Sequence, residues 1–375
     1  MSGTLVFVTE AEAIVCQDGV ITMIGSLAAM ALPADSVTIE VGDGCLVPGL
    51  IDIQLNGGFG HDFTEDPSSV WDVGARLPAF GVTAFVPTVV TSTADSRRRM
   101  LETIAAGPPA EYMGASVLGA HFEGPFISPQ ASGAHEKSLL RLPTDADDDV
   151  RSWSREAGVM LVTLAPELAG ALDLTHELVS RGVVVSSGHT AATFDQGQAG
   201  IEAGARYATH LFNAMPSLGH REPGLIGAVI ADPRVTLGLI PDGIHVHPSV
   251  VGLVAAGIGL SRLSIVTDAT AGLGMPPGRY SLGGRDVEVD STSVRIVDEG
   301  TRAGSALTAD QAIRSLVAVT GWAPSEAART MTSVPAELLG LEDRGEIRVG
   351  ARADFTLLTR DLQVAATYIG GEKWA

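Results

Sequence analysis

The sequence predicts an α/β protein: a (β/α)8 TIM-like barrel with a small β-sandwich domain formed by the N- and C-terminal segments. From Val47 onward, strand-like apolar runs alternate with helical periodicity over roughly 250 residues, which is the size and pattern of such a barrel. Short β-like runs separated by glycine turns lie on either side of this stretch. An open, doubly wound sheet is the alternative, but no Gly-x-Gly-x-x-Gly follows the first predicted barrel strand.

The barrel stretch is expected to contain eight strands, with helices between most of them. The strands are predicted at residues 50–56, 82–90, 116–121, 159–164, 183–187, 206–211, 235–240 and 263–267. Helices are predicted at residues 69–80, 96–106, 172–181, 196–203 and 249–256. After the last strand we expect an inserted β-hairpin at 279–297 and then helices at 309–319 and 325–339.

The two ends of the chain carry the remaining β-like runs. They cover residues 4–9, 13–16, 20–25 and 37–41 at one end and 355–359 and 366–369 at the other. The simplest arrangement pairs these ends beside the barrel. We therefore predict a discontinuous small domain made of residues 1–47 and 345–375, and a barrel domain made of residues 48–344.

Composition limits the classes of partner. Hydrophobic residues make up 45% of the chain and charged residues 18%, as in folded enzymes and unlike disordered chains. The formal net charge of −20 argues against nucleic acid or an anionic membrane as the main partner. An anionic small molecule would therefore need a local cluster of positive or dipolar groups.

Cysteine usage and hydropathy predict a cytoplasmic protein. Cys16 and Cys45 are far apart in the sequence and lack the spacing of a metal site, so we expect reduced core residues. No basic segment leads into a long apolar run at the N-terminus, so no signal peptide is expected. No stretch approaches the ~18 uninterrupted apolar residues of a membrane span.

Polar side chains follow six of the eight predicted barrel strands. They are Gln54 and Asn56, His121 and Glu123, His189, His210, Asp242 and His245, and Asp268. In a barrel the carboxyl ends of all strands face one mouth, and the loops there carry the chemistry. We therefore expect these side chains to lie close together.

Among them, Glu123, His189 and His210 are the ligand types that bind a catalytic divalent ion, which leaves one position for water. Asp268 has no cationic sequence neighbour and could accept a proton from that water. A lone strand-end histidine is more often a hydrogen-bonded structural residue, and a lone aspartate is usually a cap. The metal-site interpretation rests on the whole set, because independent caps need not meet at one mouth.

The other candidates have two interpretations each. His135 and His245 are plausible substrate contacts, whereas His121 receives no assigned role. Arg221 is either a solvated loop charge or an anion contact, because it precedes a predicted helix whose free N–H groups would also favour an anion.

Several motifs together resemble one known family. They are Pro-Gly-Leu-Ile-Asp-Ile-Gln-Leu-Asn-Gly-Gly (48–58), His-Phe-Glu-Gly-Pro-Phe (121–126), Ser-Gly-His-Thr (187–190), Thr-His-Leu-Phe-Asn-Ala-Met (209–215), Pro-Asp-Gly-Ile-His (241–245) and Thr-Asp-Ala-Thr (267–270). The combination resembles the N-acetylglucosamine-6-phosphate deacetylases of the amidohydrolase superfamily. The resemblance covers nearly the whole chain, through the closing segment 345–354.

The resemblance implies a role for each matching residue. Glu123, His189 and His210 would bind the metal, and Asp268 would be the acid/base. The substrate-binding residues would be Ala134, His135, Asn213, Ala214, Arg221, His245 and Ala303. Arg221 would reach the phosphate in the neighbouring subunit of a homodimer.

One position varies within the family and bears on the number of metal ions. Some members carry His-x-His at the end of the first strand and bind a second metal, whereas this chain has Gln54-x-Asn56. Amides are poor ligands for zinc or iron beside imidazole. We expect one divalent ion per subunit, with zinc the first choice and iron or another divalent ion the alternatives.

The expected activity is hydrolysis of the acetamide of N-acetylglucosamine 6-phosphate, an amino-sugar phosphate. An N-acetylgalactosamine-6-phosphate deacetylase is the alternative within the same chemistry, because one hydroxyl orientation separates the two substrates. A non-catalytic, metal-bound scaffold or sensor is the alternative from another class. The presence of Asp268 beside the metal set argues against a scaffold, which needs no base.

Overall fold

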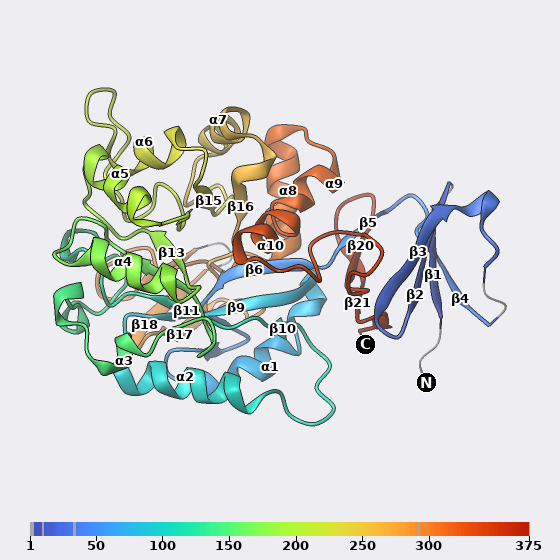
Figure 1. Ribbon diagram of the computed structural model, residues 1–375, viewed down its shortest axis with the longest axis horizontal. Coiled ribbons are helices and arrows are strands. Elements are labelled where there is room, and N and C mark those ends of the chain that lie inside the picture. Colours follow the sequence, from blue (N-terminus) through green and yellow to red (C-terminus); the bar gives the residue numbers. More distant parts are fainter. Residues whose placement is uncertain (1–3, 10, 33–34, 291–292, 375) are drawn as a thin grey trace.

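The computed structural model describes residues 4–9, 11–32, 35–290 and 293–374 of the chain. Residues 1–3, 10, 33–34 and 375 of the predicted small domain, and residues 291–292 of the predicted hairpin, lie outside the described residues. Figure 1 shows a large barrel with helices around it and a smaller β-structure at one side, where both chain ends lie.

Eight parallel strands form the barrel, as predicted. They are β6 (Leu50–Leu55), β9 (Val82–Val90), β11 (Ala120–Glu123), β12 (Val159–Leu164), β13 (Val184–Ser187), β14 (Tyr207–Ala208), β15 (Thr236–Leu239) and β16 (Leu263–Ile265). The short strand β10 (Ser116–Val117) also pairs with β9. Just beyond β6 and β16 the two chain segments join, since the Asn56 N–H donates to Ala269 O at 2.7 Å and the Asp268 N–H donates to Gln54 O at 3.0 Å.

The barrel strands are buried on both faces. Every residue of β9 and β12 is buried. β9 is rich in valine and threonine and β12 in valine and leucine, as expected of a parallel sheet covered by helices. The covering helices are α1 (Val70–Gly74), α2 (Ala94–Ala106), α3 (Asp148–Arg151), α4 (Ala171–Ser180), α5 (Phe194–Ala203), α6 (Gly224–Ala231), α7 (Pro248–Ile258), α8 (Ala309–Thr320), α9 (Pro324–Arg329) and α10 (Ser333–Leu339). Short 3₁₀ helices cover Leu27–Ala29, Pro67–Ser69, Leu77–Phe80, Pro129–Ala131, Lys137–Leu139, Pro143–Asp145 and Leu260–Arg262.

Local sequence explains where these helices begin and end. At the start of α5, Thr193 Oγ1 accepts from the Gln196 N–H and Gln196 Oε1 accepts from the Thr193 N–H, which together form a capping box. The helix ends at Gly204, whose φ of 119° lies in the region that favours glycine.

Two predicted helices are wrong in extent. Residues 69–80 form α1 and a separate 3₁₀ turn, because Pro78 has no N–H and disfavours helical geometry at the residue before it. Residues 325–339 are divided between α9 and α10. The backbone between them bonds to the barrel instead, since Thr330 O accepts from the Ile265 N–H and Met331 O accepts from the Ile51 N–H.

The chain ends form two four-stranded sheets. One has the order β3 (Val20–Ser26), β2 (Glu12–Gln17), β1 (Leu5–Val8), β4 (Val37–Glu40). The other has the order β22 (Glu372–Lys373), β21 (Val364–Ile369), β20 (Phe355–Leu358), β5 (Cys45–Pro48). Phe7 packs between them, with ring centroids 4.7 Å from Phe355 and 4.8 Å from Tyr368. The expected small β-sandwich is present, and its exact division from the barrel at residues 47/48 and 344/345 stays a prediction.

This sandwich lies at the amino ends of the barrel strands. Gly49, just before β6, donates its N–H to Asp354 O at 2.8 Å, and Thr356 Oγ1 donates to the carbonyl of Gly81, just before β9, at 2.6 Å. Figure 1 shows β20 and β21 between the barrel and the N-terminal sheet. The carboxyl ends of the strands are therefore left free for a site.

The insertion after β16 forms a third small sheet. Its strands are β17 (Gly278–Leu282), β18 (Arg285–Val289) and β19 (Val294–Ile296), so the predicted hairpin gains one further strand. The sheet has its own apolar cluster, in which Leu282, Val289 and Ala303 pack with Val90 from the end of β9. We call this unit, residues 278–304, the roof.

Two further observations concern the described residues as a set. Cys16 and Cys45 are both free thiols. None of the described helices combines the length and apolar character needed to cross a bilayer.

Candidate active site at the carboxyl ends of the strands

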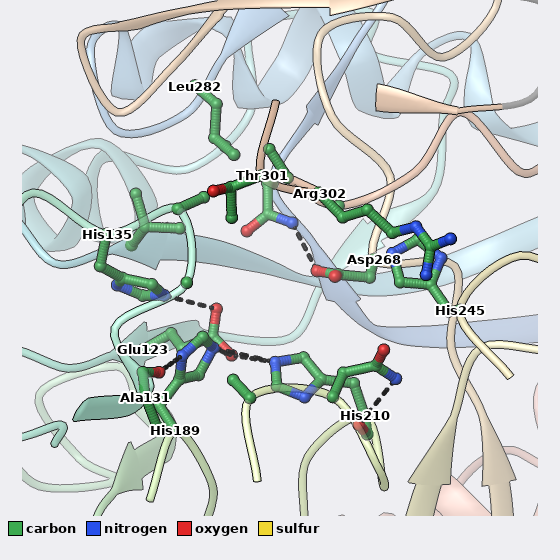
Figure 2. Close-up of a pocket in the computed structure, with 18 of the residues that line it drawn as sticks. Glu123, Ala131, His135, His189, His210, His245, Asp268, Leu282, Thr301 and Arg302 are labelled. Carbon is green, nitrogen blue, oxygen red and sulfur yellow. Dashed lines mark hydrogen bonds and ion pairs between the residues drawn. The ribbon is translucent and has the colours of Figure 1, made fainter. Parts of the chain in front are cut away.

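A cavity of about 330 Å³ lies at the carboxyl ends of the barrel strands, under the roof. Its floor carries the side chains that follow the strands. Its opposite wall comes from the roof, through Leu282, Thr301, Arg302, Ala303 and Gly304. Figure 2 shows the two sets facing each other across the space.

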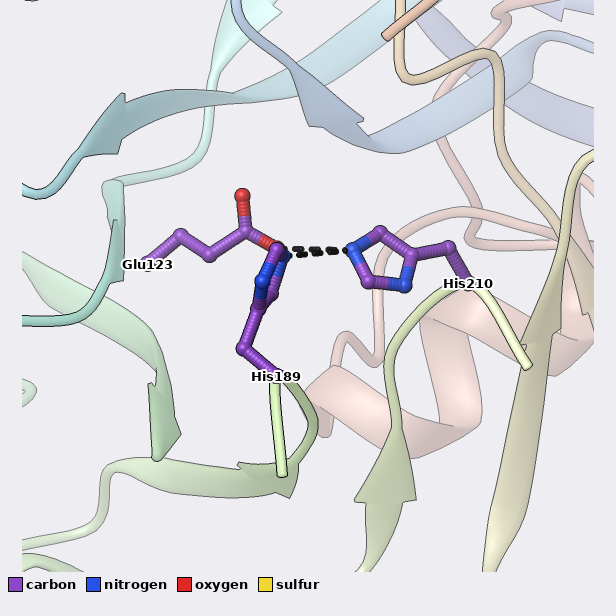
Figure 3. Close-up of side chains that lie close together, drawn as sticks. All are labelled: Glu123, His189 and His210. Carbon is purple, nitrogen blue, oxygen red and sulfur yellow. Dashed lines mark hydrogen bonds and ion pairs between the residues drawn. The ribbon is translucent and has the colours of Figure 1, made fainter. Parts of the chain in front are cut away.

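Three buried side chains converge on one point of the floor (Figure 3). Glu123 ends β11, whereas His189 and His210 each stand two residues beyond a strand. Glu123 Oε1 lies 3.5 Å from His189 Nε2 and 3.2 Å from His210 Nε2. One ligand atom from each residue lies within 4.8 Å of the others, so all three could bind a single cation.

The hydrogen bonds of His189 test whether a cation fits. Its Nδ1 lies 2.9 Å from Ala131 O, an acceptor only, so Nδ1 carries a proton and the neutral ring presents the Nε2 lone pair. That Nε2 lies only 3.0 Å from His210 Nε2. Two imidazole nitrogens and a carboxylate oxygen at this spacing suit a divalent ion with nitrogen and oxygen ligands. The three side chains therefore fit a bound divalent cation.

Backbone strain accompanies these positions. His189, His210 and Asp268 have φ values of 47°, 26° and 50°, a backbone region that residues other than glycine rarely adopt. Phe212 and Ala214, in the loop after His210, are also positive, at 78° and 50°. Such outliers cluster at functional sites, where the surrounding structure holds them.

Gln54 and Asn56 are occupied as hydrogen-bond donors. Gln54 Oε1 accepts from Thr209 Oγ1 at 2.5 Å, so its Nε2 is the atom that donates to Glu123 Oε1 at 3.0 Å. Asn56 Nδ2 donates to Asp268 Oδ1 at 2.7 Å. Both amides thus hold carboxylates of the site, which supports the expectation that they replace a second pair of metal ligands.

Asp268 and Glu123 occupy contrasting electrostatic environments. Burial raises the pKa of Asp268, and the nearby charge of Glu123 adds to this, against the opposing effect of His210. Burial would also raise the pKa of Glu123, but contacts with His135, His189 and His210 hold it well below its ordinary range. Two carboxyl groups with pKa values pushed apart are typical of an acid/base group beside a permanently ionised one.

In both His135 and His245 the ring nitrogen Nδ1 is occupied by a protein hydrogen bond, which leaves Nε2 for other contacts. The Thr91 N–H donates to His135 Nδ1 at 3.1 Å, so the proton is on Nε2, and burial lowers the pKa of this ring to about 4. His135 is therefore a neutral N–H donor, with Nε2 3.5 Å from Glu123 Oε2. His245 instead points Nδ1 at Asp242 Oδ2, 2.6 Å away, which leaves Nε2 for another partner.

The cavity brings together most residues singled out from the sequence. The following line it: Asn56, Glu123, Ala134, His135, His189, His210, Asn213, Ala214, His245, Asp268 and Ala303. Arg221 does not. It lies exposed at a separate hollow with Asp195, Glu222 and three other residues. Whether it reaches a neighbouring subunit's site stays a prediction.

Sequence reasoning missed Arg302, Thr301 and Leu282 on the roof. No motif or periodicity marks them, because they belong to an insertion whose fold over the mouth depends on tertiary packing. The one available signal was that Arg302 precedes Ala303, a residue already placed near the ligand.

Comparison with known proteins extends what the geometry shows. Residues 45–373 match the amidohydrolase family. The chain belongs to the amidohydrolase family. This confirms the superfamily expected from the motifs. Members of the superfamily are metal-dependent hydrolases, in agreement with the chemistry of the cluster formed by Glu123, His189 and His210.

Similar members of the family are sugar-phosphate deacetylases. N-acetylglucosamine-6-phosphate deacetylase from Bos taurus is 39% identical, over 88% of this chain and 83% of the relative. N-acetylgalactosamine-6-phosphate deacetylase from Escherichia coli O157:H7 is 38% identical, over 87% of each chain. An aspartate-to-alanine variant of N-acetyl-D-glucosamine-6-phosphate deacetylase from Mycobacterium smegmatis, solved in complex with N-acetyl-D-glucosamine-6-phosphate, has a TM-score of 0.88 and 34% identity. It covers 100% of this chain and 99% of that one.

Proposed function

We propose that this amidohydrolase hydrolyses the acetamide of N-acetyl-D-glucosamine 6-phosphate to D-glucosamine 6-phosphate and acetate. The observation that carries the proposal is the position of Asp268, which faces the same cavity as the cluster of Glu123, His189 and His210. The similarity to deacetylases of this substrate supports the choice of sugar.

Glu123, His189 and His210 would hold one divalent ion, with zinc the first choice and iron or another divalent ion the alternatives. Such an ion supplies Lewis acidity toward the acetyl carbonyl and makes water more acidic. A single ion is supported by Gln54 and Asn56, whose donor groups are directed at carboxylates.

Asp268 would move the proton. Its raised pKa lets the carboxylate accept a proton from the attacking water as the new carbon–oxygen bond forms. The same carboxyl would then give that proton to the nitrogen of the breaking carbon–nitrogen bond, so that the amine leaves neutral. Asn56 would hold Asp268 in place through the 2.7 Å bond to Oδ1.

The remaining cavity residues would bind the sugar phosphate. His135 offers a neutral N–H beside Glu123, and Ala134, Asn213, Ala214, His245 and Ala303 line the rest of the space. Arg221 would contact the phosphate bound in the partner subunit of a homodimer. We propose a cytoplasmic location, in keeping with an amino-sugar phosphate as substrate.

An N-acetylgalactosamine 6-phosphate substrate is the second candidate, favoured by the relative from Escherichia coli O157:H7. Release of acetate from the two phosphorylated sugars, measured as kcat/KM with purified metal-loaded protein, distinguishes the candidates. We expect the gluco sugar to be preferred. Preference for the galacto sugar would replace the proposed substrate, and no acetate from either would overturn the deacetylase assignment.

A further inference from the structure

The roof places an arginine in the wall of the active-site cavity. Among the described residues that line this cavity, Arg302 is the sole arginine or lysine. We propose that Arg302 binds the 6-phosphate of the substrate within its own subunit, so that phosphate recognition does not depend on Arg221 alone. The inference rests on the proposed function and assigns it a further specificity-determining residue.

The charges around the cavity call for such a residue. The proposed divalent ion would offset the two carboxyl groups of Glu123 and Asp268 on the floor, but the chain as a whole carries −20. Long-range repulsion therefore opposes entry of a dianionic phosphate, and binding has to come from short-range contacts. His135 does not supply the charge, since its Nδ1 accepts from the Thr91 N–H at 3.1 Å and its Nε2 faces Glu123 Oε2 at 3.5 Å.

The backbone around Arg302 is held in place on both sides. The backbone of Arg302 forms an antiparallel β-bridge with Arg295 of β19, and the N–H of the next residue, Ala303, donates to Val294 O at 3.1 Å. The residue before Arg302 is held by the same strand, because Thr301 O accepts from the Ile296 N–H at 2.8 Å. The arginine is thus presented by the edge of a small sheet, which keeps its position over the cavity.

The guanidinium itself is free to bind a ligand. In the part of the chain that the structure describes, the Arg302 side chain has no hydrogen bond or ion pair, and it is exposed. Figure 2 shows it extending past Asp268 toward the side where His245 lies, away from His135 and Glu123. Its planar fork of donors suits two phosphate oxygens.

This placement matches the shape of the substrate. The acetamide on C2 and the phosphate on C6 lie on different sides of the sugar ring, so a sugar with its acetamide over the metal cluster directs its phosphate elsewhere in the cavity. Arg302 occupies such a position. Arg221, by contrast, lines a different hollow of the same subunit.

The test compares two arginines of the roof. Arg302→Met removes the charge and keeps a long side chain. Arg279→Met removes the same charge from an exposed position on β17 that does not line the cavity. Steady-state kinetics on N-acetylglucosamine 6-phosphate and on unphosphorylated N-acetylglucosamine give KM and kcat for each variant. Arg302→Lys retains the charge without the fork and shows whether the loss follows charge.

We expect Arg302→Met to raise KM for the phosphorylated sugar about tenfold, the effect of losing roughly 1.4 kcal/mol of charge-assisted binding. Its kcat/KM should fall much more for the phosphorylated sugar than for the unphosphorylated one. For Arg302→Lys we expect a KM between those of the parent protein and Arg302→Met. For Arg279→Met we expect the KM of the parent protein. Calorimetric binding of N-acetylglucosamine 6-phosphate to Asp268→Asn, with and without Arg302→Met, should show the same tenfold difference.

Two results would overturn the inference while leaving the proposed function intact. One is an unchanged KM in Arg302→Met. The other is an equal loss on both sugars, which would place Arg302 at the reacting end or make it structural. Failure of the parent protein to release acetate from any phosphorylated sugar would instead overturn the proposed function, and the inference with it.

Discussion

The floor and the roof of the cavity are built in opposite ways. On the floor, Glu123, His189 and Asp268 are almost fully buried, and each has defined hydrogen-bond partners. On the roof, Arg302 is exposed and its side chain has no partner among the described residues. Buried charges are costly unless their geometry is fixed, whereas exposed charges are cheap and adaptable. The difference agrees with the proposal that the barrel carries the chemistry and the loops carry substrate recognition.

The largest expected effect comes from breaking the floor at its center. Glu123→Ala leaves His189 and His210 without their shared carboxylate, so we expect loss of the ion and activity at background level. Elemental analysis of the purified proteins should find one divalent ion per chain in the parent and almost none in the variant. Two equivalents in the parent would contradict the single-ion proposal based on Gln54 and Asn56.

The next effect separates proton transfer from metal binding on the same floor. Asp268→Asn should keep the metal content and lower kcat by about a thousandfold, because a general base alone contributes roughly 10²–10⁴ and this residue also serves as the acid. Together with Glu123→Ala it forms a matched pair of carboxylate variants. Retention of more than a tenth of the parent rate would remove Asp268 from the acid/base role.

A smaller effect is expected on the recognition side. Arg221→Ala should raise KM for the 6-phosphate by well over tenfold, since a charge-assisted contact is worth roughly 1.5–3 kcal/mol. Activity on the unphosphorylated sugar should change far less. An unaltered KM would remove Arg221 from phosphate recognition.

The position of Arg221 outside its own cavity makes a mixing experiment decisive for this residue. Hybrid dimers of Arg221→Ala and Asp268→Asn chains should recover part of the lost affinity, because one site then has its base and a partner's arginine. If subunits demonstrably exchange and no affinity returns, Arg221 acts within its own chain or not at all.

The smallest effect concerns stability and depends on pH. Asp52 is buried below the site, and burial raises the pKa of its carboxyl to about 7 from 3.8, against hydrogen bonds from Thr267 and Gln54 that lower it. The folded state therefore holds this proton more tightly than the unfolded state. Its contribution to stability is full below pH ~4 and is lost as the pH rises to about 7.

Asp52→Asn removes this titration with little change in shape. The stability of the variant relative to the parent should rise between pH ~4 and ~7, by at most roughly 4 kcal/mol at about 1.4 kcal/mol per pKa unit. Urea unfolding at the two pH values measures the difference. A constant difference would show that Asp52 titrates normally in the folded protein.

Sequence reasoning succeeded where one physical rule acts alone. The strand at 82–90 was predicted to the residue, because a run of β-branched residues between turn signals has few alternatives. The strand predicted at 206–211 is far shorter, since only Tyr207 and Ala208 pair with the neighbouring strands. Beyond them the positive φ of His210 turns the chain toward the cavity. Strand propensities do not predict such a backbone conformation.

The candidate site divides in the same way. Glu123, His189, His210 and Asp268 were found because strand ends converge by topology. Arg302 was missed because its position depends on how the roof packs on Val90. The separation of Arg221 from its own subunit's cavity was implied only by the resemblance and not by the residues themselves, since loop direction is a tertiary property.

The attachment of the roof has a consequence for how such an enzyme can diversify. The roof enters and leaves the barrel between β16 and α8, and the polar contacts that fasten its described residues include the Gly283 N–H to Asp62 Oδ2 at 3.0 Å and Arg285 Nη1 to Ala134 O at 3.2 Å. Because the roof lies outside the eight barrel strands, insertions or deletions there would leave the register of those strands unchanged. Changes confined to the roof, in evolution or by design, could therefore alter substrate specificity while the residues of the floor stay the same.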